Sequence, residues 1–169
     1  ASNSIEANAR MCMTSAVTGY FHSYGSDAPP TSYEDIEDAD LITFWGHNAR
    51  EAHPILFWRV ADHKKRKGIP TLVSDPRVTG TVLGLESINP HISYHNAIAH
   101  VLLTKYPDAC MSEEWLDKNT SGWQGYVSGV KERYSPAQVV ERMNKLDRGR
   151  VTVELIEEVA RIWAEASIK

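Results

Sequence analysis

Short unbroken apolar runs alternate along the chain with longer stretches in which apolar residues recur at helical spacing. Two unbroken runs, at residues 41–46 and 69–75, predict buried parallel strands. The residues between them, 53–68, predict a helix, because Pro54 lies in its first turn and its basic end is followed by glycine. A strand, a loop, a helix and a second strand within about 35 residues indicate a βαβ unit.

Helices are also predicted on both sides of this unit. Residues 9–21 predict a helix that carries Cys12 in its first turn, and a loop follows at 22–32. Ser32 is a candidate N-cap of a short acidic helix, because an aspartate stands three residues after it. Residues 81–90 predict an irregular segment or a short strand. Further helices are predicted over residues 93–107, 112–119, 135–145 and 152–167.

These elements together predict an α/β fold, in which a small parallel sheet is flanked by helices in a Rossmann-like arrangement. The chain has 169 residues, of which 42% are hydrophobic and 24% charged, so it is long enough for one domain with a real core. We therefore expect a single α/β domain over residues 1–169, with a helical part at about 93–169.

Charge and cysteine content restrict the class of protein. The net charge of −4 gives no indication of a nucleic-acid partner or an anionic membrane surface. No apolar run approaches the roughly 18 residues of a membrane span, and the polar start does not resemble a signal peptide. Two cysteines do not make a disulfide framework, which favours a reducing compartment. We expect a cytoplasmic protein, with the periplasm as the alternative.

Cys12 stands between Met11 and Met13 near the start of the chain. One interpretation is a small buried apolar residue, which is the usual role of a free cysteine. The other is a thiolate that is stabilised near a helix start and binds a soft or redox-active metal, shielded by the two thioethers. No second cysteine or nearby histidine supplies the spacing of a structural zinc site, so other ligands would come from outside this chain.

The segment WGHNAREAHP, residues 45–54, follows the first predicted strand, at the edge where α/β sheets bind ligands. Its glycine lets the backbone approach a ligand, the helix start offers N–H groups to phosphate, and an asparagine and a glutamate can bind polar edges. A histidine pair could bind zinc, but no third ligand is close; the alternative is an ordinary helix start. The candidate residues are Gly46, His47, Asn48, Glu51 and His53.

The segment SDPRVTGT, residues 74–81, follows the second predicted strand. Asp75 can accept two hydrogen bonds from a guanine-type edge, and Arg77 can reach a phosphate. Thr79 and Thr81 can add hydroxyl contacts, although an ordinary polar turn would also account for this composition. Two such loops at the ends of consecutive strands favour a nucleotide ligand.

Three stretches in order resemble the molybdopterin oxidoreductases that carry two guanine-dinucleotide pterins: NSIEANARMCMTSAV, SYEDIEDADLITFWGHNAREAHPILFWRV and GIPTLVSDPRVTGT. Within that family, NARxCMxSAV is most similar to the bacterial nitrate reductases of the assimilatory and periplasmic kinds. The later stretches YHNAIAHVLL, YSPAQVVERM and ELIEEVARIWAEA also follow the family's helical region. The resemblance covers nearly the whole chain.

The resemblance implies a molybdenum enzyme that reduces nitrate to nitrite by oxygen-atom transfer. Cys12 matches the cysteine that ligates molybdenum, and Met13 matches the methionine beside the nitrate pocket. The residues of the two loops after the strands would then hold a molybdopterin guanine dinucleotide. Two alternatives stay open: a formate dehydrogenase of the same family, in which a histidine commonly follows the metal ligand, and a nucleotide-binding module without catalysis.

The chain also departs from the family pattern. The family's catalytic subunit is several times longer, with a cysteine cluster for an iron–sulfur centre at its start and a further domain at its end. We therefore expect a central fragment or one chain of a split enzyme, inactive alone. Its partners would be the remaining segments or chains, an electron-donor protein and nitrate. The family's Pro-Gly-Thr-Asp is Pro90-His91-Ile92-Ser93 here, and Ser93 lacks the two-oxygen acceptor that aspartate offers to guanine.

Overall fold

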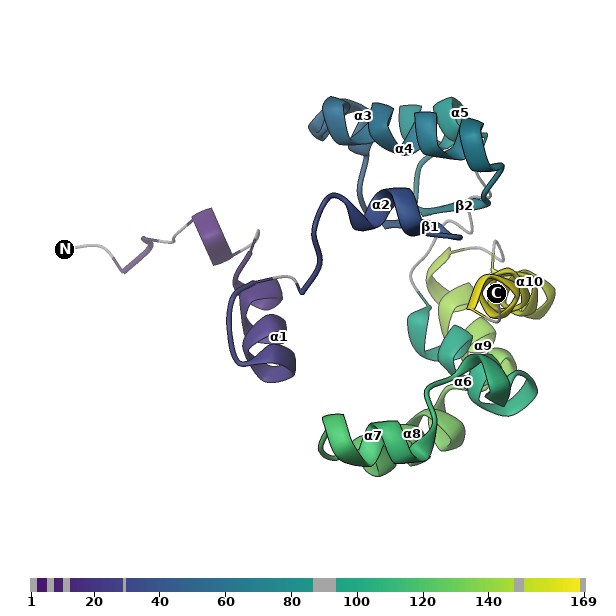
Figure 1. Ribbon diagram of the computed structural model, residues 1–169. Helices are drawn as coiled ribbons and strands as arrows, with labels where there is room; N and C mark the ends of the chain where they lie inside the picture. Colours follow the sequence, from purple (N-terminus) through teal and green to yellow (C-terminus); the bar gives the residue numbers. More distant parts are fainter. Residues whose placement is uncertain are drawn as a thin grey trace. The chain divides into compact units, whose positions relative to one another are not determined.

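The computed structural model describes residues 3–5, 8–10, 13–28, 30–86, 94–147 and 151–167. The chain divides into two compact units, Ala1–Asp35 and Ile36–Lys169 (Figure 1). The second unit contains both strands and the helices that cover them, and it matches the α/β class that the sequence predicts.

The first unit contains a 3-10 turn, η1 (Asn8–Arg10), and one helix, α1 (Thr14–Tyr24). The helix starts five residues later than the sequence predicts and ends at Gly25, whose φ of 74° is left-handed. The Thr14 hydroxyl donates a 2.7 Å hydrogen bond to the Ala9 carbonyl, which also accepts the Met13 N–H. Cys12, predicted in the first helical turn, lies outside the described residues.

The sheet of the second unit has two parallel strands, β1 (Ile42–Trp45) and β2 (Thr71–Ser74). Both lie inside the apolar runs that predict them, and Ile42 pairs with Thr71 at the start of the register. Helix α4 (Pro54–Lys67) connects the strands and ends at Gly68, whose φ is 68°. The predicted βαβ unit is therefore confirmed, since the proline start and the glycine stop set the helix bounds.

Each face of the sheet has its own core. Phe44 and Val73 pack with Phe57 beneath three helices: α3 (Ala49–Ala52), α4 and α5 (Gly80–Leu85). Leu72 packs on the opposite face with residues of α6 (His95–Lys105), α9 (Pro136–Asp147) and α10 (Val153–Ser167). Successive strand residues point to opposite faces, so a strand covered on both sides is apolar throughout. Figure 1 shows α3, α4 and α5 on one side of the strands and α6, α9 and α10 on the other.

Two helices differ from the sequence expectation. Helix α5 occupies residues for which an irregular segment or a strand is predicted, because its glycines and β-branched residues hide the helical pattern. Gly84 lets α5 approach α4, since a Cβ there would lie 2.8 Å from the Phe57 ring. Helix α8 (Trp123–Arg133) is not predicted, and it also contains two glycines, Gly125 and Gly129.

The remaining predicted elements are confirmed with small shifts. The Ser32 N–H donates to the Asp35 carboxylate at 2.7 Å at the start of α2 (Asp35–Asp38), as the capping pattern predicts. Helix α7 (Glu113–Asn119) follows a second 3-10 turn, η2 (Pro107–Ala109). None of the helices in the described ranges combines the length and the apolar character that a membrane span requires.

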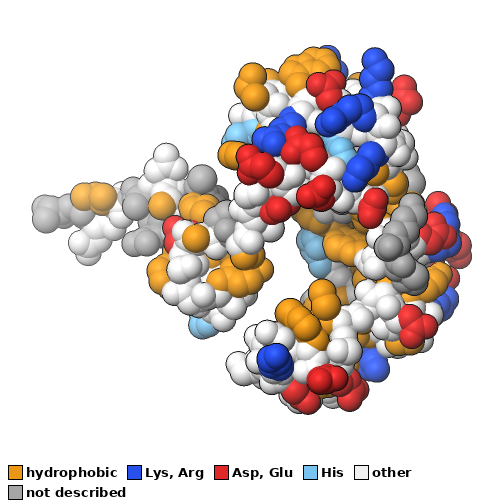
Figure 2. All heavy atoms as spheres, viewed as in Figure 1, with side chains coloured by type: hydrophobic (Ala, Val, Ile, Leu, Met, Phe, Trp, Pro, Cys, Tyr) orange, Lys and Arg blue, Asp and Glu red, His pale blue; other side chains and the backbone are white. Residues whose placement is uncertain are grey.

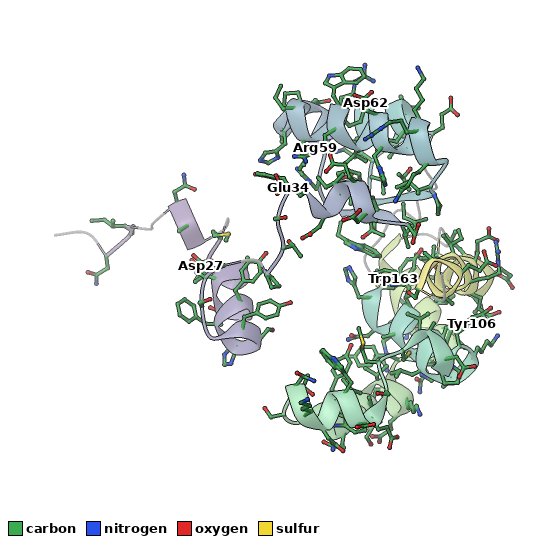
Figure 3. All side chains as sticks on the ribbon, in the orientation of Figure 1. Asp27, Glu34, Arg59, Asp62, Tyr106 and Trp163 are labelled. Carbon is green, nitrogen blue, oxygen red and sulfur yellow. The ribbon has the colours of Figure 1, made fainter. Side chains whose placement is uncertain are left out.

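An ion pair connects helix α2 to helix α4. Arg59 donates two hydrogen bonds to the Glu37 carboxylate, one of 2.8 Å from Nη2. Figure 3 shows Arg59 pointing from α4 toward α2, and Figure 2 shows acidic and basic side chains mixed over these helices. The Arg59 guanidinium holds the pKa of Glu37 below its ordinary value, so the pair stays ionised at neutral pH.

Candidate functional site

The loops that follow β1 and β2 start side by side at the carboxyl edge of the sheet. The Gly46 N–H donates to the Ser74 carbonyl at 2.7 Å, which extends the strand pairing by one step. Gly46 has a φ of 60°, a left-handed conformation that favours glycine. A Cβ at this position would meet no atom within 4 Å. The backbone is thus open to an approaching ligand where the two loops begin, as the sequence predicts for this edge.

A buried threonine connects the two loops. Thr81 is fully buried, and its hydroxyl donates to Asn48 Oδ1 at 2.9 Å while accepting the Arg50 N–H at 2.9 Å. Two residues that the sequence identifies separately as ligand contacts are therefore bonded to each other across 33 positions of the chain. This arrangement fixes the loop after β1 against the start of α5.

Arg50 belongs to this connection, although it is not among the site residues that the sequence predicts. Its side chain passes close to Gly80, where an added Cβ would lie 3.1 Å from Arg50 Cδ. Its guanidinium lies 6.0 Å from the centre of the Phe57 ring. A glycine at the start of α5 is the one sequence signal of this close approach. Arg50 therefore helps to hold the two loops in register.

His47 and His53 lie next to each other, with 2.7 Å between Nε2 of His47 and Nδ1 of His53. The rings meet edge to face, with centroids 4.8 Å apart. Burial, and secondly the charge of His53, lowers the pKa of His47, so one ring donates a neutral N–H to the other at pH 7. Within the described ranges no group of three or more His, Cys, Asp or Glu residues could hold a metal ion, so this pair gains no third zinc ligand there.

The end of β2 and the loop after it contain buried polar atoms that no described residue pairs. Ser74 and Thr79 are 3% and 6% exposed, and among the described residues neither hydroxyl has a hydrogen-bond partner. Between them, Asp75 is also buried, and its Oδ1 accepts the Arg77 N–H at 2.8 Å. The Arg77 side chain is exposed, with Nε 3.9 Å from the same oxygen.

This donor set fits the nucleotide end of a pterin cofactor. A buried unpaired hydroxyl costs about 1–3 kcal/mol, and a ligand with its own donors and acceptors would remove that cost. Phosphate, ribose and guanine groups offer such atoms, and Arg77 adds an exposed cation within reach of a phosphate. Ser74 was not predicted from the sequence, since a serine at the end of an apolar run gives no signal of its own.

The other predicted site residues are exposed or lie outside the described part of the chain. Glu51 is exposed on α3, without a contact that would define a role. Met13 is 41% exposed and lies directly before α1 in the first unit. Cys12 and Ser93, together with Pro90, His91 and Ile92, lie outside the described residues. The predicted metal ligand therefore remains a prediction.

Cys110 is a free thiol at the end of η2, half buried, with Sγ 3.9 Å from the Tyr106 carbonyl oxygen. Burial raises its pKa, although the charge of Lys131 opposes this in part. It therefore stays protonated and unreactive at neutral pH.

Comparison with known proteins assigns the chain to a family. The sequence profile described as molybdopterin oxidoreductase matches residues 1–148. A nitrate reductase of Synechocystis sp. is 34% identical over 97% of this chain, and a periplasmic nitrate reductase of Desulfovibrio desulfuricans is 34% identical over 98%. A nitrate reductase of Klebsiella oxytoca is 47% identical over 46% of the chain and 9% of its own length. The chain spans 22% of the length of each of the first two relatives. It belongs to the molybdopterin oxidoreductase family.

Proposed function

We propose that the chain is the cofactor-binding part of a molybdenum-dependent nitrate reductase that reduces nitrate to nitrite. The observation that carries this proposal is the similarity to two nitrate reductases over 97% and 98% of the chain. The pair of loops at the carboxyl edge of the sheet supports it, because the edge combines an open backbone with unpaired buried hydroxyls.

In this proposal the edge holds a molybdopterin guanine dinucleotide. Asp75 accepts hydrogen bonds from guanine, Arg77 neutralises a phosphate, and Thr79 donates its unpaired hydroxyl. Asn48 and Thr81 act by fixing the loops, because their polar atoms are already bonded to each other. The remaining predicted contacts are Gly46, His47, Glu51, His53 and Ser93.

When bound, the cofactor would supply the redox chemistry that oxygen-atom transfer from nitrate requires. The protein binds and orients the nucleotide and excludes water from its phosphates. Cys12 provides a soft thiolate ligand to the metal, and Met13 borders the nitrate pocket. Both residues precede α1 in the sequence.

The finer structural expectations belong to the same proposal. The two strands are the beginning of a Rossmann-like sheet, and residues 1–169 form one molybdopterin-binding domain with a helical part at about 93–169. The other segments or chains of the catalytic subunit provide an iron–sulfur cluster and the second pterin contacts, and an electron-donor protein delivers electrons. The low cysteine count favours the cytoplasm, while a periplasmic relative makes the periplasm the alternative.

The experiment uses the complete protein that carries this chain, assayed separately with nitrate and with formate. We expect nitrate reduction without formate oxidation, and molybdenum with guanine nucleotide released on denaturation. Formate oxidation without nitrate reduction would assign the protein to the formate dehydrogenases instead. The chain purified alone should contain little molybdenum and should not reduce nitrate. If the complete protein contained neither metal nor nucleotide, the result would favour a nucleotide-binding module without catalysis.

A further inference from the structure

A pocket lies on the face of the sheet opposite to the loops described above. It has a volume of about 300 Å³ and lies between the start of α6, the end of α8 and α9. Its walls include His95 and Asn96 from α6, Tyr134 from the end of α8, and Val139, Arg142 and Met143 from α9. His95 lies against Trp45, the last residue of β1, with ring centroids 3.9 Å apart. The pocket therefore lies next to the carboxyl end of β1.

Arg142 gives this pocket a positive charge. Within the described ranges no aspartate or glutamate forms an ion pair with it, and none lines the pocket. Its guanidinium lies 5.8 Å from the centre of the Tyr134 ring, a cation–π contact that holds the side chain but leaves its N–H donors available. Partial burial lowers the pKa of His95, so His95 is neutral at pH 7 and, among the described residues that line the pocket, Arg142 supplies the charge.

The rest of the lining limits the class of ligand. Val139 and Met143 are four positions apart on α9, and Arg142 lies on the same side of the helix, so aliphatic surface lies beside the cation. An inorganic anion would occupy a small part of 300 Å³ and leave this apolar surface uncovered. An anion with a flat apolar body covers both kinds of surface, since pockets of this type pair apolar walls with a few polar groups.

We propose that this pocket binds a small organic carboxylate, whose head pairs with Arg142 and whose apolar body lies against Tyr134, Val139 and Met143. The Asn96 side chain adds a donor beside the head, because its Oδ1 is already the acceptor for the Tyr126 hydroxyl at 3.4 Å. The site uses no residue of the proposed pterin site, so it does not depend on the proposed function.

The test is calorimetric titration of the full chain with benzoate, benzamide and inorganic phosphate. Benzamide has the shape of benzoate without its charge, and phosphate has the charge without the apolar body. We expect benzoate to bind at least ten-fold more tightly than either. Equal binding of benzoate and benzamide would overturn the role of Arg142, and tighter binding of phosphate would overturn the role of the apolar wall.

Variants on α9 make the test specific to the pocket. Arg142→Gln should weaken benzoate binding at least ten-fold, and Arg142→Lys should retain part of it. Lys145→Gln is the matched control, because it removes one positive charge from the same helix at a residue that pairs with Glu141 outside the pocket. An equal loss in Lys145→Gln, or no loss in Arg142→Gln, would overturn the proposal. Thermal unfolding of each variant checks that it is folded.

Discussion

The two loops at the carboxyl edge of the sheet differ in how their polar atoms are satisfied. In the loop after β1, Asn48 and the Arg50 N–H are bonded to Thr81, and His47 is bonded to His53. In the loop after β2, the hydroxyls of Ser74 and Thr79 are buried without partners in the described part of the chain. In the first loop these polar groups form hydrogen bonds with other groups of the protein. After β2, the two hydroxyls could instead form hydrogen bonds with a ligand.

This difference separates residues that position the site from residues that bind its ligand. Both loops carry the residue types expected of nucleotide contacts, so composition does not distinguish them. Hydrogen bonding does, because a hydroxyl that already donates and accepts has no donor left for a ligand, while an unpaired buried hydroxyl is destabilising until it is bonded. Substitutions that break the bonds between Asn48, Arg50 and Thr81 should therefore affect stability, and those of the unpaired hydroxyls after β2 should affect cofactor binding.

The largest effect is expected from Thr81→Val. Valine has the same shape but leaves Asn48 Oδ1 and the Arg50 N–H without their partner, so the free energy of unfolding should fall by about 3 kcal/mol. Urea denaturation measures the change. Thr104→Val on α6 is the control, because that hydroxyl bonds only backbone carbonyls of its own helix. A loss no larger than that of the control would show that the connection between the loops contributes little.

A smaller loss is expected from Gly46→Ala. The φ of 60° is strained for alanine, and because no atom lies within 4 Å of the added Cβ, the cost is conformational strain of about 1 kcal/mol. Gly19→Ala in α1 is the matched control, since its Cβ also meets no atom within 4 Å and its backbone is helical. The control should be neutral or slightly stabilising in the same denaturation assay. A neutral Gly46→Ala would mean that the backbone of this loop can relax.

The histidine pair makes stability depend on pH. The pKa of His47 is lower in the folded chain than its ordinary 6.5, so the unfolded chain binds the proton more readily. The free energy of unfolding should therefore fall as the pH drops below about 6.5 and through the folded pKa. His47→Gln should reduce this dependence. An unchanged pH profile in His47→Gln would remove the pair from the account.

The sequence predicts the strands, helices and loops that carry the site better than it predicts the hydrogen bonds within the site. Continuous apolar runs identify β1 and β2, and Pro54 and Gly68 fix the bounds of α4, because these signals are local. Helices α5 and α8 were missed because glycines interrupt their patterns, and in α5 the glycine is needed for contact with Phe57. Both loops were identified from their place after a strand.

Which residues of the loops bond each other depends on tertiary contact. Asn48 and Thr81 are 33 positions apart, so no local pattern reveals that they satisfy each other. The same holds for the Ser74 hydroxyl, which is buried without a partner among the described residues. Cys12 and Ser93 stay predictions that rest on the resemblance.

The measurement that tests the central claim most directly is the guanine nucleotide and molybdenum content of the complete protein carrying Thr79→Val. Valine removes a buried hydroxyl that has no partner in the described chain, so the empty protein should keep its stability within about 0.5 kcal/mol. We predict that cofactor content nonetheless falls several-fold, while Thr104→Val retains the parental content. Parental cofactor content in Thr79→Val would contradict the assignment of the loop after β2 to nucleotide binding.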